Sequence, residues 1–386
     1  MKAIEQSPDA VAEALDGLGV AGGVDLADAY ARVWWTVLAE PGDGAAGELI
    51  ARYGAIEALR IATTDTDDEW DAARERWRPR QKSELVRSTL DAARRASAAL
   101  IVPSDPRWPD RLDDLGVHTP PALWTRGDLG RLAGAATVAI VGARAATPYG
   151  EGVATDLAAE LASDGVIVVS GAAYGIDGAA HRATLRAGGS TVAFLAGGVD
   201  RAYPRGHESL LAGVAASGAV VSETPCGATP TKWRFLARNR LIAALADAVV
   251  VVEAGHRSGS LNTAAHAAQL GRALGAVPGP ITSAASAGSH RVLREFDGVC
   301  VTSAADVREM LGEQVTGSSE GGAEGRTDDT TRLLDALSPR AGRDVDDIAR
   351  RAGFSPDDAR ARLGFAELEG RAVRDDDGRW RSLSAR

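Results

Sequence analysis

The sequence predicts an α/β protein built on an extended Rossmann-like, doubly wound parallel sheet, with an all-α N-terminal domain and a C-terminal winged helix. Three observations lead to this prediction. Strand-length apolar runs alternate with helix-length segments between residues 137 and 302, the first 95 residues place apolar side chains at helical spacing, and a Gly-, Ser- and acid-rich stretch sets off a short tail. The predicted domains are 1–95 (helical), 96–312 (Rossmann-like), 313–328 (a flexible linker) and 329–386 (winged helix).

The N-terminal region is expected to form a small helical domain. The stretches "ADAYARVWWTVLAE" and "GELIARYGAIEALRIA" both repeat apolar residues at the spacing of a helix. We assign Trp34 and Trp35 to its core, because a tryptophan removes a large apolar area from water.

The central region carries the sheet. Its apolar runs are TVAIV (137–141), VIVVS (166–170), TVAFLA (191–196), GAVVSE (218–223), AVVVVEA (248–254) and ALGAVP (273–278). Continuous apolar strands separated by helices indicate a parallel sheet covered on both faces. Ligands of such sheets bind at the carboxyl ends of the strands, so the residues that follow each run are the candidates for a site.

The tail after residue 328 has the pattern of a winged helix. Two helical segments, a turn at Gly353 and a helix from Ser355 precede two short strands around Asp376. The helix from Ser355 would be the recognition helix, yet it opens with Asp357 and Asp358, where DNA bases would lie. This favours a contact with protein, or a weak role in DNA binding, over sequence-specific recognition.

Composition limits the class of protein. The chain has 386 residues, of which 45% are hydrophobic and 25% charged, as in a globular protein without membrane insertion. Cys226 and Cys300 form no CxxC pair, so we expect neither disulfides nor a thiolate metal site, and a cytoplasmic location. The net charge of −10 argues against non-specific coating of nucleic acid but permits one local basic groove.

Small residues follow two of the strands where a helix begins. Ser170-Gly171 comes after the second run and Ser258-Gly259-Ser260 after the fifth, while Arg144 follows the first. Backbone N–H groups and the helix dipole favour an anion at such positions, which predicts a phosphate site. The alternative is plain N-capping by the serines; Asp177 is expected to cap the helix behind Ser170-Gly171.

Cations and rings alternate after the fourth run. Lys232, Arg234, Arg238 and Arg240 are interleaved with Trp233 and Phe235. This mixture is typical of single-stranded nucleic-acid binding, where cations follow the backbone and rings stack on bases. A solvated loop with its rings docked in the core is the alternative.

Familiar catalytic and cofactor motifs are absent from the sequence. There is no GxGxxG after the first strand, no GxxxxGK[ST], and no metal-ligand spacing among the six histidines. His181 could act as a base, but a structural hydrogen bond is the simpler interpretation. We therefore expect no cofactor, no metal and no enzymatic activity.

An ordered set of motifs resembles the DNA processing protein A family (DprA, also called Smf). The matching stretches are "VAIVGARAATPYG", "VVSGAAYGIDGAAH", "LAGGVDRAYPRGH", "AVPGP" and the long segment from "VSETPCGATPTKWRFLARNR" to "GHRSGSLNTAAHAAQLGR", within residues 100–300. The resemblance implies a protein that binds single-stranded DNA, protects it and loads the RecA recombinase in natural transformation or related recombination. It also implies a homodimer, with single-strand-binding protein as a further partner.

Carried over by motif, the DNA site uses Arg144, the Ser170-Gly171 backbone, Lys232 and Phe235, and Arg238, Asn239 and Arg240 of the RNR motif. The sequence departs from the family at Leu236, where Pro is usual, and at His207 and His290, where Asn is common.

Two other functions stay open. One is a nucleotide-binding phosphoribohydrolase-type enzyme, although its PGGxGTxxE motif is missing; the other is a Rossmann and winged-helix regulator that senses a small ligand.

Overall fold

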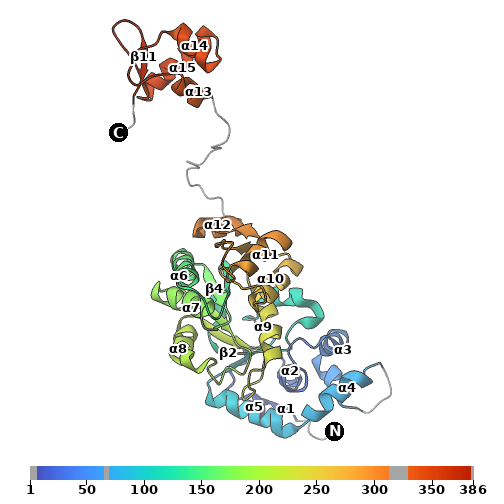
Figure 1. Ribbon diagram of the computed structural model, residues 1–386. Coiled ribbons are helices and arrows are strands. Elements are labelled where there is room, and N and C mark those ends of the chain that lie inside the picture. Colours follow the sequence, from blue (N-terminus) through green and yellow to red (C-terminus); the bar gives the residue numbers. More distant parts are fainter. Residues whose placement is uncertain (1–6, 65–68, 313–328, 384–386) are drawn as a thin grey trace. The chain divides into compact units, whose positions relative to one another are not determined.

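The computed structural model describes residues 7–64, 69–312 and 329–383, and the chain divides into two compact units, Met1–Val315 and Thr316–Arg386 (Figure 1). The predicted linker, 313–328, lies outside the described residues. Among the helices that the structure describes, none is long and apolar enough to cross a membrane.

The first unit is built on a nine-stranded sheet in the order β1-β2-β6-β5-β4-β3-β7-β8-β9. Strands β3 to β9 run parallel, and β2 pairs antiparallel with both β1 and β6. The strands are β1 (Ala99–Ile101), β2 (Leu123–Gly127), β3 (Thr137–Val141), β4 (Ile167–Ser170), β5 (Thr191–Phe194), β6 (Ala219–Ser222), β7 (Ala248–Val251), β8 (Ala273–Ala276) and β9 (Val299–Cys300). All six apolar runs are strands, which confirms the predicted fold class.

Helices cover both faces of the sheet, as continuous apolar strands require. Figure 1 shows α6 (Pro148–Ser163), α7 (Ile176–Arg186) and α8 (Glu208–Ser217) along one face, and α9 (Lys232–Leu245), α10 (Ser260–Gln269) and α11 (Ala287–Glu295) along the other. Alternate residues of one strand serve the two cores: Val138 packs with α6 and α7, and Ala139 with α9 and α10. Helix α12 (Ala304–Met310) follows strand β9, and the described part of the unit also contains the 3-10 helices η1 (Arg78–Arg80), η2 (Asp110–His118), η3 (Leu129–Leu132) and η4 (Arg205–His207).

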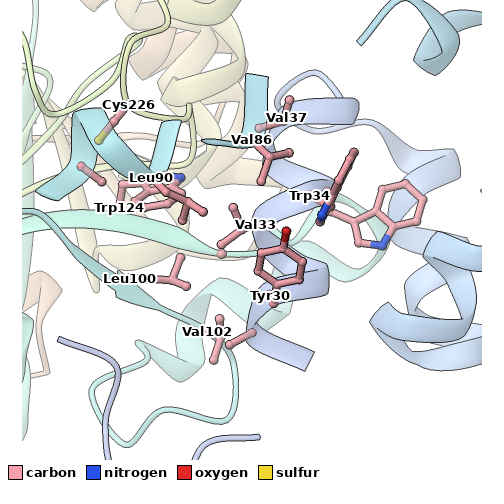
Figure 2. Packing of buried hydrophobic residues seen from close by; sticks show 14 of the residues in the cluster. Tyr30, Val33, Trp34, Val37, Val86, Leu90, Leu100, Val102, Trp124 and Cys226 are labelled. Atoms are coloured by element: carbon pink, nitrogen blue, oxygen red, sulfur yellow. The ribbon is translucent and has the colours of Figure 1, made fainter. Parts of the chain in front are cut away.

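The N-terminal helices form a single core with one edge of the sheet. They are α1 (Pro8–Leu15), α2 (Leu26–Leu38), α3 (Gly44–Thr63), α4 (Asp71–Trp77) and α5 (Ser83–Arg95). Figure 2 shows side chains of α2 and α5 directed toward Leu100, Val102 and Trp124, and the same cluster extends to Val220 of β6. Trp34 and Trp35 are both buried, at 1% and 0% exposure. The domain boundary at residues 95 and 96 therefore stays a prediction, although α5 ends and β1 begins on either side of it.

The second unit is a small helical module with a two-stranded sheet. It contains α13 (Asp329–Asp335), α14 (Val345–Ala352), α15 (Pro356–Leu368), β10 (Ala372–Arg374) and β11 (Trp380–Ser382). Gly353 ends α14 in the left-handed conformation, with φ of 71°, and the Ser355 side chain caps α15 by accepting from the Asp358 N–H. The helices and strands follow the order of the predicted winged helix.

Candidate nucleic-acid interface

The strand order reverses between β3 and β7, and a cavity of about 690 Å³ opens at the carboxyl ends of these two strands. Ligands of doubly wound sheets bind at such a switch point, because the loops leaving the two neighbouring strands diverge to opposite faces. The cavity is lined by the loops after β3 and β7, by Tyr203 and by the first turns of α9.

The loop after β3 is held rigidly. The Ala143 N–H donates to the carbonyl of Glu253 at 2.6 Å, and the buried Glu253 carboxylate accepts from the N–H and hydroxyl of Thr147 at 2.8 and 2.9 Å. A Cβ at Gly142 would lie 2.5 Å from the side chain of Ile176, and one at Gly175 would lie 2.3 Å from the Ala143 carbonyl. Glycine is therefore required where these two loops cross, and Arg144 extends from a fixed base.

Three side chains from separate segments meet inside the cavity. The Arg144 guanidinium carbon lies 4.6 Å from the ring centroid of Phe235, and the Tyr203 ring lies 5.3 Å from the same centroid at an angle of 52°. Tyr203 is 45% exposed. A cation on the face of an aromatic ring is a favourable contact, and together the three groups form a surface suited to a flat, anionic ligand.

Lys232 begins α9, and the helix directs one face at the cavity. Lys232, Phe235, Leu236 and Asn239 recur at helical spacing, and all four line the cavity. Thr231 caps the helix by accepting from the Arg234 N–H at 3.3 Å. Across the described part of the chain, neither Lys232 nor Arg144 forms an ion pair, so both charges are available to a ligand.

The two arginines of the RNR motif differ from Arg144 and Lys232, whose charges are available to a ligand, because both are 95% buried. Arg238 reaches the cavity wall, but its Nη1 donates to the carbonyls of Gly171 and Phe194 at 2.7 and 2.5 Å. Burial lowers the pKa of Arg238 to about 10, with the Asp177 carboxylate acting against this shift.

Arg240 lies away from the cavity lining, contrary to its expected place in the DNA site. Its guanidinium binds both oxygens of the Glu223 carboxylate at 2.5 and 2.6 Å, and it also donates to the carbonyl of His118 at 3.1 and 2.8 Å. The charge and the donors of Arg240 are thus used inside the protein. Asn239 lines the cavity, but its amide donates to the Gly259 carbonyl at 3.2 Å.

The loop after β4 also differs from the expected phosphate cradle. The Ser170 hydroxyl is fully buried and donates to the Ile140 carbonyl at 2.6 Å. The Gly171 N–H donates to the Asp177 carboxylate at 3.1 Å, and the Ala173 N–H donates to the same oxygen at 3.3 Å. A carboxylate of the chain thus takes the position predicted for a phosphate, and neither Ser170 nor Gly171 lines the cavity.

Asp177 is therefore not the cap of its helix. The capping position of α7 is Gly175, which has φ of 74° and no side-chain cap, while Asp177 lies in the first turn and reaches back to the preceding loop. Burial raises the pKa of Asp177, and the Arg238 guanidinium and two backbone N–H bonds oppose that shift. The sequence alone could not predict these hydrogen bonds of Asp177, because only the turn brings the carboxylate close to the backbone N–H groups that donate to it.

The loop after β7 places Ser258, Gly259 and Ser260 on the cavity wall, and their binding of a phosphate stays a prediction. The two serine hydroxyls lie 2.7 Å apart at the start of α10, and either can donate to the other or to a ligand. Arg257, an exposed lining residue, and Tyr203 were missed as site residues. Both follow strand ends, so the rule that selected Arg144 would have selected them as well.

Comparison with known proteins finds relatives over most of the chain. The family model described as DNA recombination-mediator protein A matches residues 99–312, and that of the DprA winged helix domain matches residues 318–378. A putative DNA processing protein DprA of Mycobacterium tuberculosis is 42% identical over 381 residues, which covers 93% of this chain and 96% of that protein. The DNA processing protein DprA of Bacillus subtilis is 37% identical over 199 residues, covering 51% and 67%.

Two solved structures are similar to the chain. DNA processing protein A from Streptococcus pneumoniae aligns with a TM-score of 0.60 at 29% identity, covering 72% of this chain and 95% of that one. DNA processing protein A from Helicobacter pylori aligns with a TM-score of 0.51 at 29% identity, covering 55% and 95%, and its structure was reported for a unique single-stranded DNA binding mode.

Proposed function

The chain belongs to the DNA recombination-mediator protein A (DprA) family, and on this premise we propose that it binds single-stranded DNA in the cavity at the β3–β7 switch point. One observation carries the proposal. Arg144 and Lys232, two cations without ion pairs in the described part of the chain, flank the Phe235 and Tyr203 rings in one cavity. The cations would follow the phosphates, and the rings would stack on a base.

Binding by this site is expected to be largely independent of base sequence. The amide of Asn239 is engaged within the protein, and rings and cations recognise the faces of bases and the backbone rather than base edges. The serine hydroxyls at the start of α10 suit a phosphate oxygen. Of the predicted DNA-binding residues, we retain Arg144, Lys232, Phe235, Ser258, Gly259 and Ser260 as direct contacts. We assign Ser170, Gly171, Arg238, Asn239 and Arg240 to holding the loops.

The test is a comparison of oligo(dT) binding across a salt series for the wild type and the double variant Arg144→Ala, Lys232→Ala. Each phosphate of a single strand that the protein no longer neutralises reduces the slope of log K against log salt by about 0.7, so this variant should bind more weakly, with a slope smaller by about 1.4. Lys82→Ala with Arg87→Ala is the matched control, because it removes the same charges from two exposed positions, Lys82 just before α5 and Arg87 within it. An equal decrease in both double variants would reject the cavity as the site.

The later steps of the proposed function rest on family membership. We propose that the protein protects the bound strand and loads RecA onto it, as a homodimer in the cytoplasm, with single-strand-binding protein as a further partner, in natural transformation or related recombination. The assay is RecA filament formation on DNA coated with single-strand-binding protein. If the wild-type protein binds oligo(dT) but does not stimulate RecA filament formation, the loading role is rejected, whereas the proposed binding site still stands.

A nucleotide-processing enzyme is the main rival, because the cavity would also accept a nucleoside monophosphate. Among the residues that the structure describes, no group of His, Cys, Asp or Glu could hold a metal ion. The lining carboxylate, Asp177, is committed to two backbone N–H groups. We therefore propose a binding protein, and release of free base from AMP in a mass-spectrometric assay would overturn this.

The winged-helix unit is proposed to contact protein rather than to read bases. Its recognition helix α15 begins with Asp357 and Asp358, and it exposes Phe365 by 68% and Leu368 by 86%. Acidic residues repel phosphates, and exposed apolar residues favour protein contacts. Unchanged duplex affinity after removal of residues 329–386 is the expected result.

A further inference from the structure

One tryptophan stands apart from all others in the chain. The protein has eight tryptophans, and seven of them are exposed by 8% or less, whereas Trp233 is 62% exposed. An indole left in water keeps a large apolar face unburied, and such residues are enriched at binding surfaces. The exposed position of Trp233 therefore indicates that its indole contacts a binding partner.

The position of Trp233 connects it with the cavity. It is the second residue of α9, directly after Lys232, and Leu236 lies one turn further along the same flank of the helix. Leu236 is 36% exposed and lines the cavity. Trp233 and Leu236 thus form a short apolar strip that continues from the cavity wall to its outer rim.

The backbone that carries Trp233 is fixed. The neighbouring Arg234 binds both oxygens of the Glu40 carboxylate at 2.9 and 3.0 Å and donates to the Thr229 carbonyl at 2.9 Å. Thr231 caps the same turn. Across residues 7–64, 69–312 and 329–383, the Trp233 indole has no hydrogen bond and no ring contact. The ring is held on a rigid turn without a partner of its own.

We propose that Trp233 is a second base-stacking position outside the cavity, so that the single strand leaves the cavity past Lys232 and places its next bases on the indole. The inference rests on the proposed binding of single-stranded DNA and extends the site beyond the cavity. Phe235 and Tyr203 would hold one base inside, Lys232 would hold the phosphate at the rim, and Trp233 would hold a base outside. A ring accepts any base, so this extension adds affinity without sequence preference.

The experiment measures how affinity depends on strand length. For oligo(dT) of about 20 nucleotides, stacking worth 1–3 kcal/mol per base means that Trp233→Ala weakens binding by roughly 5- to 150-fold. Trp233→Phe should retain most of the affinity, because the ring remains. Binding of dTMP, which fits in the cavity alone, should be equal in the wild type and both variants. Tyr53→Ala, which removes an exposed ring from α3, is the control.

Fluorescence gives a second, independent readout. Because the other seven tryptophans are buried and shielded from contact with DNA, oligo(dT) should quench only the Trp233 component of the wild-type emission and leave the emission of Trp233→Phe nearly unchanged. An abasic strand of equal length should not quench, since it has phosphates but no bases.

The outcomes separate this inference from the proposed function. Loss of oligo(dT) binding in Arg144→Ala, Lys232→Ala, with unchanged binding in Trp233→Ala, would overturn the second stacking position and leave the cavity site standing. Equal losses for dTMP and for oligo(dT) in Trp233→Ala, or equal quenching by the abasic strand, would also overturn it. Failure of the wild type to bind oligo(dT) at all would reject the proposed function itself.

Discussion

Arg240→Ala should lower the stability of the protein and leave the DNA affinity of its folded form unchanged. Its guanidinium and the Glu223 carboxylate are 6% and 3% exposed and are joined by two hydrogen bonds of 2.5 and 2.6 Å. Removal of one partner leaves a buried, unpaired carboxylate and takes two donors from the His118 carbonyl. Breaking such a pair costs about 3–5 kcal/mol.

A surface pair provides the matched control. Arg291 and Glu295 approach to 2.6 Å, but their side chains are 40% and 55% exposed. Arg291→Ala should therefore cost about 1 kcal/mol at most. A double variant, Arg240→Met with Glu223→Leu, should recover most of the loss, because replacing both members of a buried pair by apolar residues of similar volume is often neutral.

The assay is urea and thermal denaturation, followed by oligo(dT) binding well below the melting temperature. At roughly 2 °C per kcal/mol for a domain of this size, Arg240→Ala should lower Tm by about 6–10 °C, with the affinity of the folded form unchanged. A variant that keeps its Tm but loses affinity would refute the structural role and return Arg240 to the DNA site.

Three further predictions concern the loop after β4 and helix α7, which follows it. Gly171→Ala should cost about 1–3 kcal/mol in urea denaturation, because the new Cβ would lie 2.3 Å from Nη1 of Arg238, which two carbonyls hold in place. Asp177→Asn should cost about 1–3 kcal/mol in the same assay, because two loop N–H groups lose a charged acceptor and the Arg238 guanidinium loses a nearby negative charge. His181, fully buried with a pKa lowered to about 3, mainly by burial, should make the wild type lose about 1.4 kcal/mol per pH unit as pH falls from 6.5 to about 3. His181→Gln should lack this slope in denaturation curves recorded at each pH.

The sign of the pH effect follows from proton binding. Below pH 6.5 the unfolded histidine takes up a proton while folded His181 stays neutral, so acid favours the unfolded state. The Thr191 hydroxyl donates to the Val168 carbonyl at 2.6 Å and accepts from Nδ1 of His181 at 2.7 Å, which leaves Nε2 unprotonated. Equal slopes in wild type and variant would contradict this protonation state.

The glycine prediction has a control of opposite sign. Gly152 lies inside α6, and a Cβ there would meet no atom within 4 Å. Gly152→Ala should stabilise the protein by about 0.5–1 kcal/mol, because alanine is the better helix former. If both alanine variants were stabilised, the close packing of Gly171 against Arg238 would be wrong.

The sequence predicted the sheet better than it predicted the use of its charges. The six strands were identified because a parallel sheet buries both faces, which leaves continuous apolar runs in the sequence. Strand β9 was missed, since Val299–Cys300 is too short to show a period. The winged helix was predicted because its turn and cap residues, Gly353 and Ser355, have strong local preferences.

The motif alone could not show which of its arginines would bind DNA and which would stabilise the fold. A cation serves DNA or the fold according to whether a carboxylate from elsewhere lies beside it, and Glu223 and Asp177 belong to other segments of the chain. The helical period of KWRFLARNR did indicate which residues share the face that lines the cavity, because it places Lys232, Phe235, Leu236 and Asn239 on one face. Arg240 falls outside that face, where only the tertiary structure shows its partner.

The core that the N-terminal helices share with the sheet has a consequence for synthesis on the ribosome. Helices α1 to α5 are made before the sheet, but Trp124 of β2 and Val220 of β6 complete their apolar cluster. At about 5–20 residues per second, the wait between Arg95 and Ser222 is on the order of ten seconds. During that time the helices expose the faces that later meet the sheet, so we expect the nascent chain to depend on a chaperone until β6 has emerged.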